Sequence, residues 1–267
     1  MAAEEPAPDG ELSAAAELAR LYDLDLADQR DDIELYLALA RHGRPILELA
    51  CGSGRICVPL AQAGHDVVGV DRDPAMLARA EAAWSAVSDG NSAGSLELIE
   101  GDITSLDLAR RFELVILGFN GLLLVGDRDT QLAALRVAAA HLAPGGQAVV
   151  DVWLPAPDDL AAYDGRLELA WLRVDPDGGR AVAKLWAADY DAATLSARVT
   201  AIFDSWPTGG GPVRRIARTD EAHLLGASEL LALAERAGLR PTSIGGDYSM
   251  APFGQGSERV VLVCRLL

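Results

Sequence analysis

Residues that could bind a nucleotide-like ligand follow one another between Pro45 and Asp73. The apolar run Ile46–Leu49 predicts a buried strand, and Gly52-Ser53-Gly54 predicts a sharp turn with no Cβ in the way of a ligand. The helix expected directly after this turn would aim free N–H groups at an anionic group. A second predicted strand ends at Asp71, whose carboxylate could accept hydrogen bonds from the two hydroxyls of a ribose. The segment therefore predicts the start of a nucleotide-binding βαβ fold.

Two common nucleotide-binding loops fit this segment poorly. The dinucleotide pattern needs a third glycine where the chain has Cys57, and the nucleoside triphosphate loop needs a Lys-Ser or Lys-Thr pair that is missing. A nucleotide-binding oxidoreductase is therefore a weak alternative. The remaining pattern, Glu48-x-x-x-Gly52-x-Gly54 with Asp71 at a strand end, resembles motifs I and II of the class I S-adenosylmethionine (SAM) dependent methyltransferases. Pro144-Gly-Gly before a strand resembles a further hallmark of that family.

The resemblance covers residues 45–153 most fully and implies SAM as the cofactor and S-adenosylhomocysteine (SAH) as its product. It implies that Asp102 accepts from the adenine amine, that Ile103 packs on one ring face, and that Met76 or Arg72 covers the other. Tyr22 would donate its hydroxyl to the methionine carboxylate, or would simply pack its helix on the core. The implied cofactor-binding residues are Tyr22, Glu48, Ala50, Gly52, Gly54, Arg55, Asp71, Arg72, Met76, Asp102, Ile103 and Phe119.

The acceptor site is harder to predict. Phe119-Asn120 follows a predicted strand at residues 112–117, where such folds bring the methyl group close to the acceptor. Relatives often have a histidine where this chain has Leu124, so no catalytic base is carried over. The catalytic candidates are Asn120 and His223, with packing at a sheet-to-helix junction as the alternative for His223. The substrate-binding candidates are Asn120, Trp153, Trp171 and Tyr248, with packing or a dimer contact as the alternative for Trp171.

Methyl transfer from a sulfonium is an in-line displacement that needs alignment and exclusion of water more than catalytic side chains. We therefore expect a SAM-dependent methyltransferase that acts on an N, O or C nucleophile of a small metabolite in bacterial secondary metabolism. The alternative is a SAM-binding enzyme that does not methylate, such as a cyclase or rearrangement catalyst on the same fold. The loss of the usual histidine at Leu124 motivates that alternative.

The elements that position these residues predict an α/β fold: a Rossmann-like seven-stranded sheet with the last strand antiparallel, helices on both faces, and an inserted antiparallel β-meander. We expect a helical lid over residues 1–44, with a helix that Ser13 caps and that ends at Tyr22-Asp23, and a second helix over residues 31–42. The SAM-binding core should span residues 45–154 and the meander 155–219, while residues 220–267, with a helix capped by Ser228, complete the sheet. Because the meander is rich in aromatic residues, one face should cover the active site or contact a second subunit in a homodimer.

Composition narrows the partners and the compartment. The 267 residues carry a formal charge of −17, which disfavours nucleic acid and membrane surfaces and favours a small-molecule substrate. No apolar run reaches eighteen residues and residues 1–12 look disordered rather than like a signal peptide, so we expect a cytoplasmic protein. Cys51, Cys57 and Cys264 are too few and too scattered for a disulfide framework, and no metal site is expected.

Overall fold

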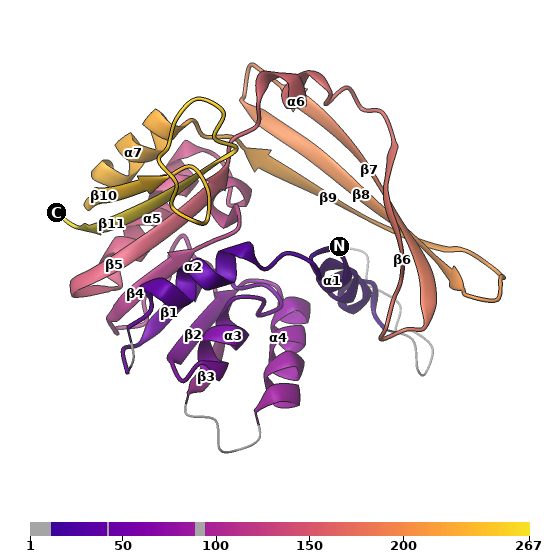
Figure 1. Ribbon diagram of the computed structural model, residues 1–267, viewed down its shortest axis with the longest axis horizontal. Coiled ribbons are helices and arrows are strands. Elements are labelled where there is room, and N and C mark those ends of the chain that lie inside the picture. The colour runs from indigo at the N-terminus through magenta and orange to yellow at the C-terminus, as the bar shows by residue number, and fades with distance from the viewer. Residues whose placement is uncertain (1–11, 42, 89–93) are drawn as a thin grey trace.

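A computed structural model describes residues 12–41, 43–88 and 94–267 (Figure 1). Of residues 1–12, which are expected to be disordered, residues 1–11 lie outside the described residues, as does His42. The second helix, predicted over residues 31–42, ends earlier, at Leu39. Two sheets organise the rest of the chain. No described helix is both long enough and apolar enough to cross a membrane.

The larger sheet has seven strands in the order β10-β11-β5-β4-β1-β2-β3. Strands β1 to β5 run parallel to one another, and the last strand β11 lies antiparallel between β10 and β5. The strands are β1 (Ile46–Leu49), β2 (Asp66–Asp71), β3 (Ser95–Glu100), β4 (Phe112–Leu117), β5 (Leu142–Trp153), β10 (Leu239–Gly245) and β11 (Arg259–Leu266). This topology confirms the predicted Rossmann-like sheet with its antiparallel last strand.

Helices cover both faces of this sheet, because its central strands are apolar on both sides. Leu47 and Val115 belong to the hydrophobic cluster that packs against α5 (Arg128–Ala140) and α7 (Ala227–Arg236). Ile46 and Leu114 belong to the cluster on the opposite face, under α2 (Asp31–Leu39) and α3 (Cys57–Gln62), with α4 (Pro74–Val87) at its margin. The alternation of strand residues thus anchors helices on both faces of the sheet.

The predicted meander is confirmed as a second, four-stranded antiparallel sheet in the order β6-β7-β8-β9. Its strands are β6 (Glu168–Val174), β7 (Arg180–Asp191), β8 (Ser196–Pro207) and β9 (Arg214–His223). The sheet projects away from the core, and α1 (Ala14–Asp25) lies between it and α4 (Figure 1). The inserted sheet therefore does not extend the core sheet but forms a separate layer beside α1.

Several predicted element ends were wrong. Helix α1 continues through Asp25, because Leu24 packs into a hydrophobic cluster after Tyr22. The N-cap of α7 is Gly226 rather than Ser228, and the side chain of Glu229 accepts a hydrogen bond from the Gly226 N–H. Three further elements have other bounds than expected. Strand β9 continues past residue 219 to His223, and β5 begins at Leu142, before the Pro-Gly-Gly turn. Helix α3 begins at Cys57, with two residues between it and the glycine turn. The caps predicted at Ser13 and Asp73 are confirmed.

The 3-10 helix η1 (Gly121–Leu124) and the short helix α6 (Pro157–Ala161) were not predicted. Helix η1 is a single turn directly after β4, and neither element has the repeated apolar spacing that identifies a longer helix in a sequence.

Candidate functional site

The carboxyl ends of β1, β2, β3 and β4 surround one cavity of about 280 Å³, as expected for a ligand site at the edge of a parallel sheet. Tyr22 from α1 and Arg218 from β9 contribute to its wall from outside the core. The lining residues are Tyr22, Glu48, Ala50, Cys51, Gly52, Arg55, Ile56, Asp71, Arg72, Asp73, Met76, Gly101, Asp102, Ile103, Thr104, Gly118, Phe119, Gly121, Leu124, Val125, Thr130 and Arg218. All the predicted cofactor residues except Gly54 are among them.

The carboxylate of Asp71 fixes the glycine turn. One oxygen accepts a hydrogen bond from the Gly52 N–H at 2.8 Å and the other accepts one from the Asp73 N–H at 2.9 Å. An ionised carboxylate has about four acceptor positions, so these two bonds leave capacity for the hydroxyls of a ligand. Asp71 therefore shapes the turn as well as lining the cavity, a role that the sequence did not predict.

The two glycines of the turn differ in their surroundings. Gly52 has φ +54°, and a Cβ placed there would meet no atom within 4 Å, so its free side faces open space. Gly54 has φ +84°, and a Cβ there would come within 3.0 Å of the side chains of Ala80 and Val58. Gly54 thus permits close approach of α4 to the turn, while Gly52 keeps space free at the cavity.

Glu48 at the carboxyl side of β1 is a buried acid with an unsatisfied oxygen. Its side chain is 3% exposed, and Oε2 has no hydrogen-bond partner among the described residues. Burial raises the pKa of this carboxyl well above its usual value, although the nearby Arg55 guanidinium opposes the shift. Buried polar atoms without a partner are rare in native proteins, so Glu48 is a candidate contact for a ligand in this cavity.

Arg55 and Tyr22 also line the cavity. The Arg55 guanidinium donates two hydrogen bonds to the buried Asp32 carboxylate, at 2.7 and 2.6 Å, and lies 4.3 Å from the centre of the Phe119 ring. Burial raises the pKa of Tyr22 to about 12, so its hydroxyl is a hydrogen-bond donor throughout the neutral range. The cavity wall thus offers both a fixed cation and a neutral donor.

Strained backbone marks the cavity at two strand ends. Ala50 after β1 has φ +59°, and Phe119 and Asn120 after β4 have φ +48° and +66°. Such left-handed conformations cost free energy for residues other than glycine and persist where the surroundings fix them. The N–H of Phe119 donates to Asp151 at 2.6 Å, and Asp151 is fully buried. Its carboxylate also accepts hydrogen bonds from Tyr36, Tyr248 and Arg259.

A model of the family described as "Methyltransferase domain" matches residues 46–146. The cypemycin N-terminal methyltransferase of a Streptomyces species is 29% identical over 221 residues, which are 83% of this chain and 82% of that protein. The structure of the CcbJ methyltransferase from Streptomyces caelestis is 26% identical and superimposes with a TM-score of 0.72 over 91% of this chain and 96% of that one. Residues 46–146 therefore form a methyltransferase domain, and the chain resembles SAM-dependent methyltransferases over most of its length.

A third relative of the methyltransferase modifies an amino sugar. The dTDP-3-amino-3,6-dideoxy-alpha-D-glucopyranose N,N-dimethyltransferase of Streptomyces fradiae is 29% identical over 147 residues, which are 52% of this chain and 54% of that protein. The enzyme therefore uses SAM as its methyl donor, as predicted. Methyl transfer is favoured over the non-methylating alternative, because these relatives are named as methyltransferases.

The adenine contact implied for Asp102 competes with a local turn. Asp102 lines the cavity, but its Oδ1 accepts hydrogen bonds from the Thr104 N–H at 2.8 Å and the Thr104 hydroxyl at 2.7 Å. The Thr104 hydroxyl lowers the pKa of Asp102 and keeps it ionised. Ile103 and Met76, each 6% exposed, line the same cavity, so the structure brings together the residues proposed to hold an adenine ring.

The predicted acceptor residues lie outside this cavity in the methyltransferase. The side-chain oxygen of Asn120 accepts a hydrogen bond from the Trp153 N–H at 2.6 Å, which ties the loop after β4 to the end of β5. Trp153 and Tyr248 line a second cavity of about 470 Å³ beside the loop between β10 and β11. Trp171 donates its indole N–H to Asp25 of α1 at 2.8 Å. Direct substrate contact by these residues therefore stays a prediction.

His223, the other catalytic candidate, ends β9. Its backbone oxygen accepts a hydrogen bond from Gln131 at 2.8 Å, and its side chain does not line the first cavity. The junction between the inserted sheet and α7 is thus held through this backbone contact, and a catalytic role for the imidazole stays a prediction.

Arg218, Thr130 and Val125 line the cavity but were not predicted. The position of Arg218 could have been predicted from the alternation of side chains between the two faces of β9. Ile216 packs against the cluster that contains residues of α1, and Arg218, two residues later, shares that face of the strand. Thr130 and Val125 carried no such signal, because their positions depend on the unpredicted turn after β4.

Proposed function

We propose that this methyltransferase transfers the methyl group of SAM to an amine nitrogen of a small natural product. Two relatives support nitrogen as the acceptor, since one is named for the N-terminus of cypemycin and another for an amino sugar. The net charge of −17 supports a small molecule rather than nucleic acid as the partner. The enzyme's own cavity adds a chemical argument.

The observation that carries the proposal is the composition of the cavity away from the glycine turn. Leu124, Val125, Thr130 and Arg218 line the cavity from η1, the turn after it, α5 and β9, and no histidine is among the described lining residues. The lining carboxylates are Glu48 of β1, Asp71 and Asp73 at and just after the end of β2, and Asp102 two residues after β3, which are the elements of the proposed cofactor end. A hydroxyl acceptor would need a base to remove its proton, whereas an amine can enter in its neutral form.

The wall favours that neutral form of an amine. Apolar side chains such as Leu124 and Val125 desolvate a bound amine, which lowers its pKa. The guanidinium of Arg218 acts in the same direction, although its hydrogen bond to Asp220 at 2.8 Å weakens the effect. We therefore propose that the wall helps to keep the acceptor nitrogen unprotonated and free to react.

The residues around the cofactor end fit SAM. Glu48 has an unsatisfied oxygen for the methionine ammonium, and Asp71 has free acceptor positions for the ribose hydroxyls. Ile103 and Met76 provide apolar surface for adenine, and Tyr22 offers a hydroxyl to the methionine carboxylate. Bound SAM supplies an activated methyl group on its sulfonium sulfur. These roles of individual residues are part of the proposal.

The test compares amine acceptors with matched alcohols. The enzyme is incubated with SAM and either amino sugars and peptides with a free N-terminus or the corresponding hydroxyl analogues. We expect methylated amine and one equivalent of SAH per methyl transferred, with no product from the alcohols. Preferential methylation of an alcohol would contradict the proposal, and product without SAH would indicate a non-methylating reaction.

We propose a homodimer through the outer face of the inserted sheet, the face away from α1. Leu169, Leu172 and Val174 on the edge strand β6 are each more than 60% exposed in the single chain. Exposed apolar side chains that lie together often mark a surface that binds another protein. A second copy would present the same apolar face. Light scattering should give a dimer mass, and Leu172→Asp should give a monomer; a monomeric wild type would contradict this.

A further inference from the structure

Helix α1 carries Tyr22 to the cavity, and its leucine side chains pack on the inserted sheet. Leu21 and Leu24, which are 0% and 8% exposed, form a cluster with Val182 of β7 and Phe203 of β8. Neither of the two hydrophobic clusters described for the core contains a residue of α1. Burial of apolar surface therefore holds α1 to the sheet.

Polar contacts also join α1 to the inserted sheet. Arg20 of α1 forms an ion pair with Asp175 in the β6–β7 turn, and the two side chains are only 9% and 2% exposed. Asp25 at the end of α1 accepts hydrogen bonds from Trp171 of β6 and Lys184 of β7. Removing one partner of a buried ion pair is costly, so separating α1 from the sheet would be unfavourable.

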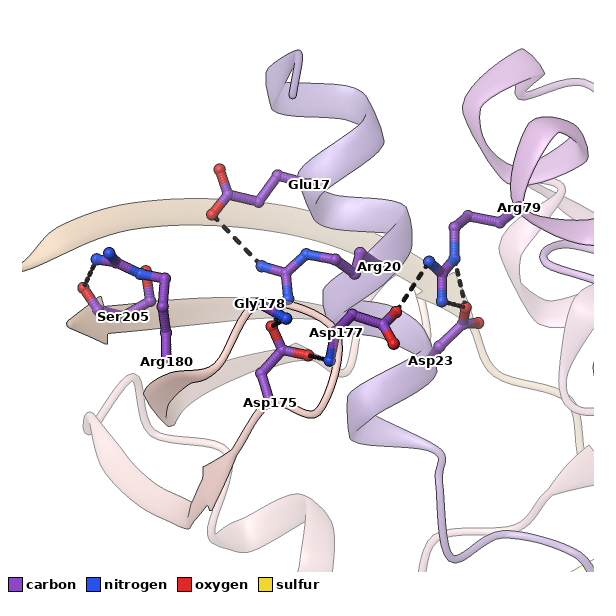
Figure 2. Close-up of polar contacts among 9 residues, drawn as sticks. All are labelled: Glu17, Arg20, Asp23, Arg79, Asp175, Asp177, Gly178, Arg180 and Ser205. Carbon is purple, nitrogen blue, oxygen red and sulfur yellow. Dashed lines mark hydrogen bonds and ion pairs between the residues drawn. The ribbon is translucent and has the colours of Figure 1, made fainter. Parts of the chain in front are cut away.

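Besides the packing of α1 against α4, one side chain of α4 makes ion pairs with both α1 and the β6–β7 turn (Figure 2). Arg79 donates from Nε to Asp23 of α1 at 2.7 Å and from Nη1 to Asp177 of the β6–β7 turn at 3.1 Å. Its side chain is 31% exposed, and its partners are 32% and 53% exposed. Partly exposed ion pairs of this kind are weak individually. Arg79 thus joins both α1 and the inserted sheet to α4. These contacts are easier to break than the buried contacts between α1 and the sheet.

Helix α4 is in turn fixed to the cofactor turn. Ala80, the neighbour of Arg79, is fully buried, and its side chain is one of the two nearest to Gly54, where an added Cβ would come within 3.0 Å of it. The position of Arg79 is therefore set by the part of the core that lines the cavity.

We propose that α1 and the inserted sheet move as one unit, and that Arg79 is the positioning residue that holds this unit closed over the bound cofactor. The proposal rests on SAM binding in the first cavity, as given under the proposed function. It changes the expected domain division, because α1 belongs with residues 168–223 rather than with the rest of the N-terminal segment. Release of SAH then requires the two contacts of Arg79 to break, while the contacts between α1 and the sheet persist.

The test measures the rate of SAH dissociation by stopped-flow fluorescence. Arg79→Gln should raise this rate about fivefold, the effect expected when two partly exposed ion pairs are lost. Raising NaCl from about 0.05 to about 0.5 M should accelerate dissociation from the wild type by a similar factor, because salt screens these pairs. Arg79→Gln should show little further salt effect. An unchanged rate in the variant would overturn the proposal.

Asp177→Asn separates this proposal from a simple effect on α1. Asp177 lies on the β6–β7 turn and does not line the cavity, so it can affect SAH only through the sheet. We expect a two- to threefold faster dissociation, which is about half the effect of Arg79→Gln on a logarithmic scale. A wild-type rate in Asp177→Asn would refute the joint movement of helix and sheet.

Arg110→Gln is the matched control. Arg110 forms a similarly exposed ion pair with Glu97 at 2.8 Å, away from the first cavity, and its variant should leave the rate unchanged. A faster rate in this control would assign the effect to lost surface charge and refute the role of Arg79. If the wild type binds no SAH at all, the proposed function fails first. If the wild type binds SAH and all variants release it alike, only the present inference fails.

Discussion

Glu48→Gln should make the free enzyme more stable and the cofactor bind more weakly. The Glu48 side chain is 3% exposed, and its Oε2 has no partner among the described residues. A buried polar group without a partner costs about 1–3 kcal/mol. Glutamine keeps the shape of the side chain and removes the ionisable group, so it relieves the part of this cost that comes from the charge.

The stability gain should depend on pH. Burial raises the native pKa of Glu48 above the value of about 4.3 that a glutamate has in an unfolded chain. The neutral carboxyl therefore favours the native state below that unfolded value, and this contribution is lost as the pH rises toward the native pKa. Glutamine does not titrate. The variant should thus match the wild type near pH 4.5 and exceed it at pH 8.

The assay is thermal unfolding of the free enzyme at both pH values, with binding of SAH measured by calorimetry. A gain of about 1 kcal/mol corresponds to roughly 2–4 °C in the melting temperature of a domain of this size class. Loss of a hydrogen bond to a charged group should weaken SAH binding about 10- to 100-fold. Glu100→Gln is the control, because Glu100 is exposed at the end of β3 and outside the cavity.

Two results would refute this reasoning. If Glu48→Gln melts at the wild-type temperature at pH 8, the buried carboxylate carries no cost in the free enzyme. If SAH binds with unchanged affinity, Glu48 does not face the ligand, and the unsatisfied oxygen then has another cause.

Other substitutions should separate cofactor binding from folding. Asp71→Ala should weaken SAH binding, measured by calorimetry, by 100-fold or more, because it removes both the proposed ribose contact and the acceptor that fixes the Gly52 N–H; unchanged affinity would contradict both roles. Asp151→Asn should lower the free energy of unfolding in urea by about 3–5 kcal/mol, since it breaks a buried ion pair with Arg259; a loss below about 1 kcal/mol would contradict this. Tyr22→Phe should lower SAM affinity equally at pH 7 and pH 10, because the wild-type hydroxyl has a pKa of about 12 and stays protonated; an effect confined to one pH would contradict its role as a neutral donor.

Most residues at the cofactor end of the cavity could be predicted from the sequence, because each lies at a strand end or within a few residues of one. Glu48, Gly52 and Asp71 are fixed by a strand, a turn and a second strand, and neighbouring parallel strands bring their carboxyl ends together. The seven-stranded sheet followed from the same alternation of apolar strands and amphipathic helices. Local pattern therefore sufficed to predict most residues around this end of the cavity.

The acceptor half could not be read in this way, since its residues depend on contacts between distant segments. Asn120 seemed free to meet a substrate, but its side chain accepts a hydrogen bond from Trp153, 33 residues away. Trp171 seemed a substrate candidate, but its indole N–H is 146 residues from its partner Asp25. No local pattern reveals which partner a polar group finds at such separations. The short turn η1 escaped prediction because a single turn has no periodic signal.

The inserted sheet also explains how acceptor choice can vary without loss of the cofactor site. Its inner face is largely occupied in holding α1, through Val182, Phe203 and the ion pair of Asp175. Arg218 is the residue of this sheet that lines the cavity, among the described residues. Substitutions at Arg218 would therefore change the proposed acceptor wall while the glycine turn and Asp71 stay unchanged. The proposed acceptor wall thus includes a residue of a sheet separate from the one that carries the glycine turn and Asp71, so acceptor recognition can change while cofactor recognition is retained.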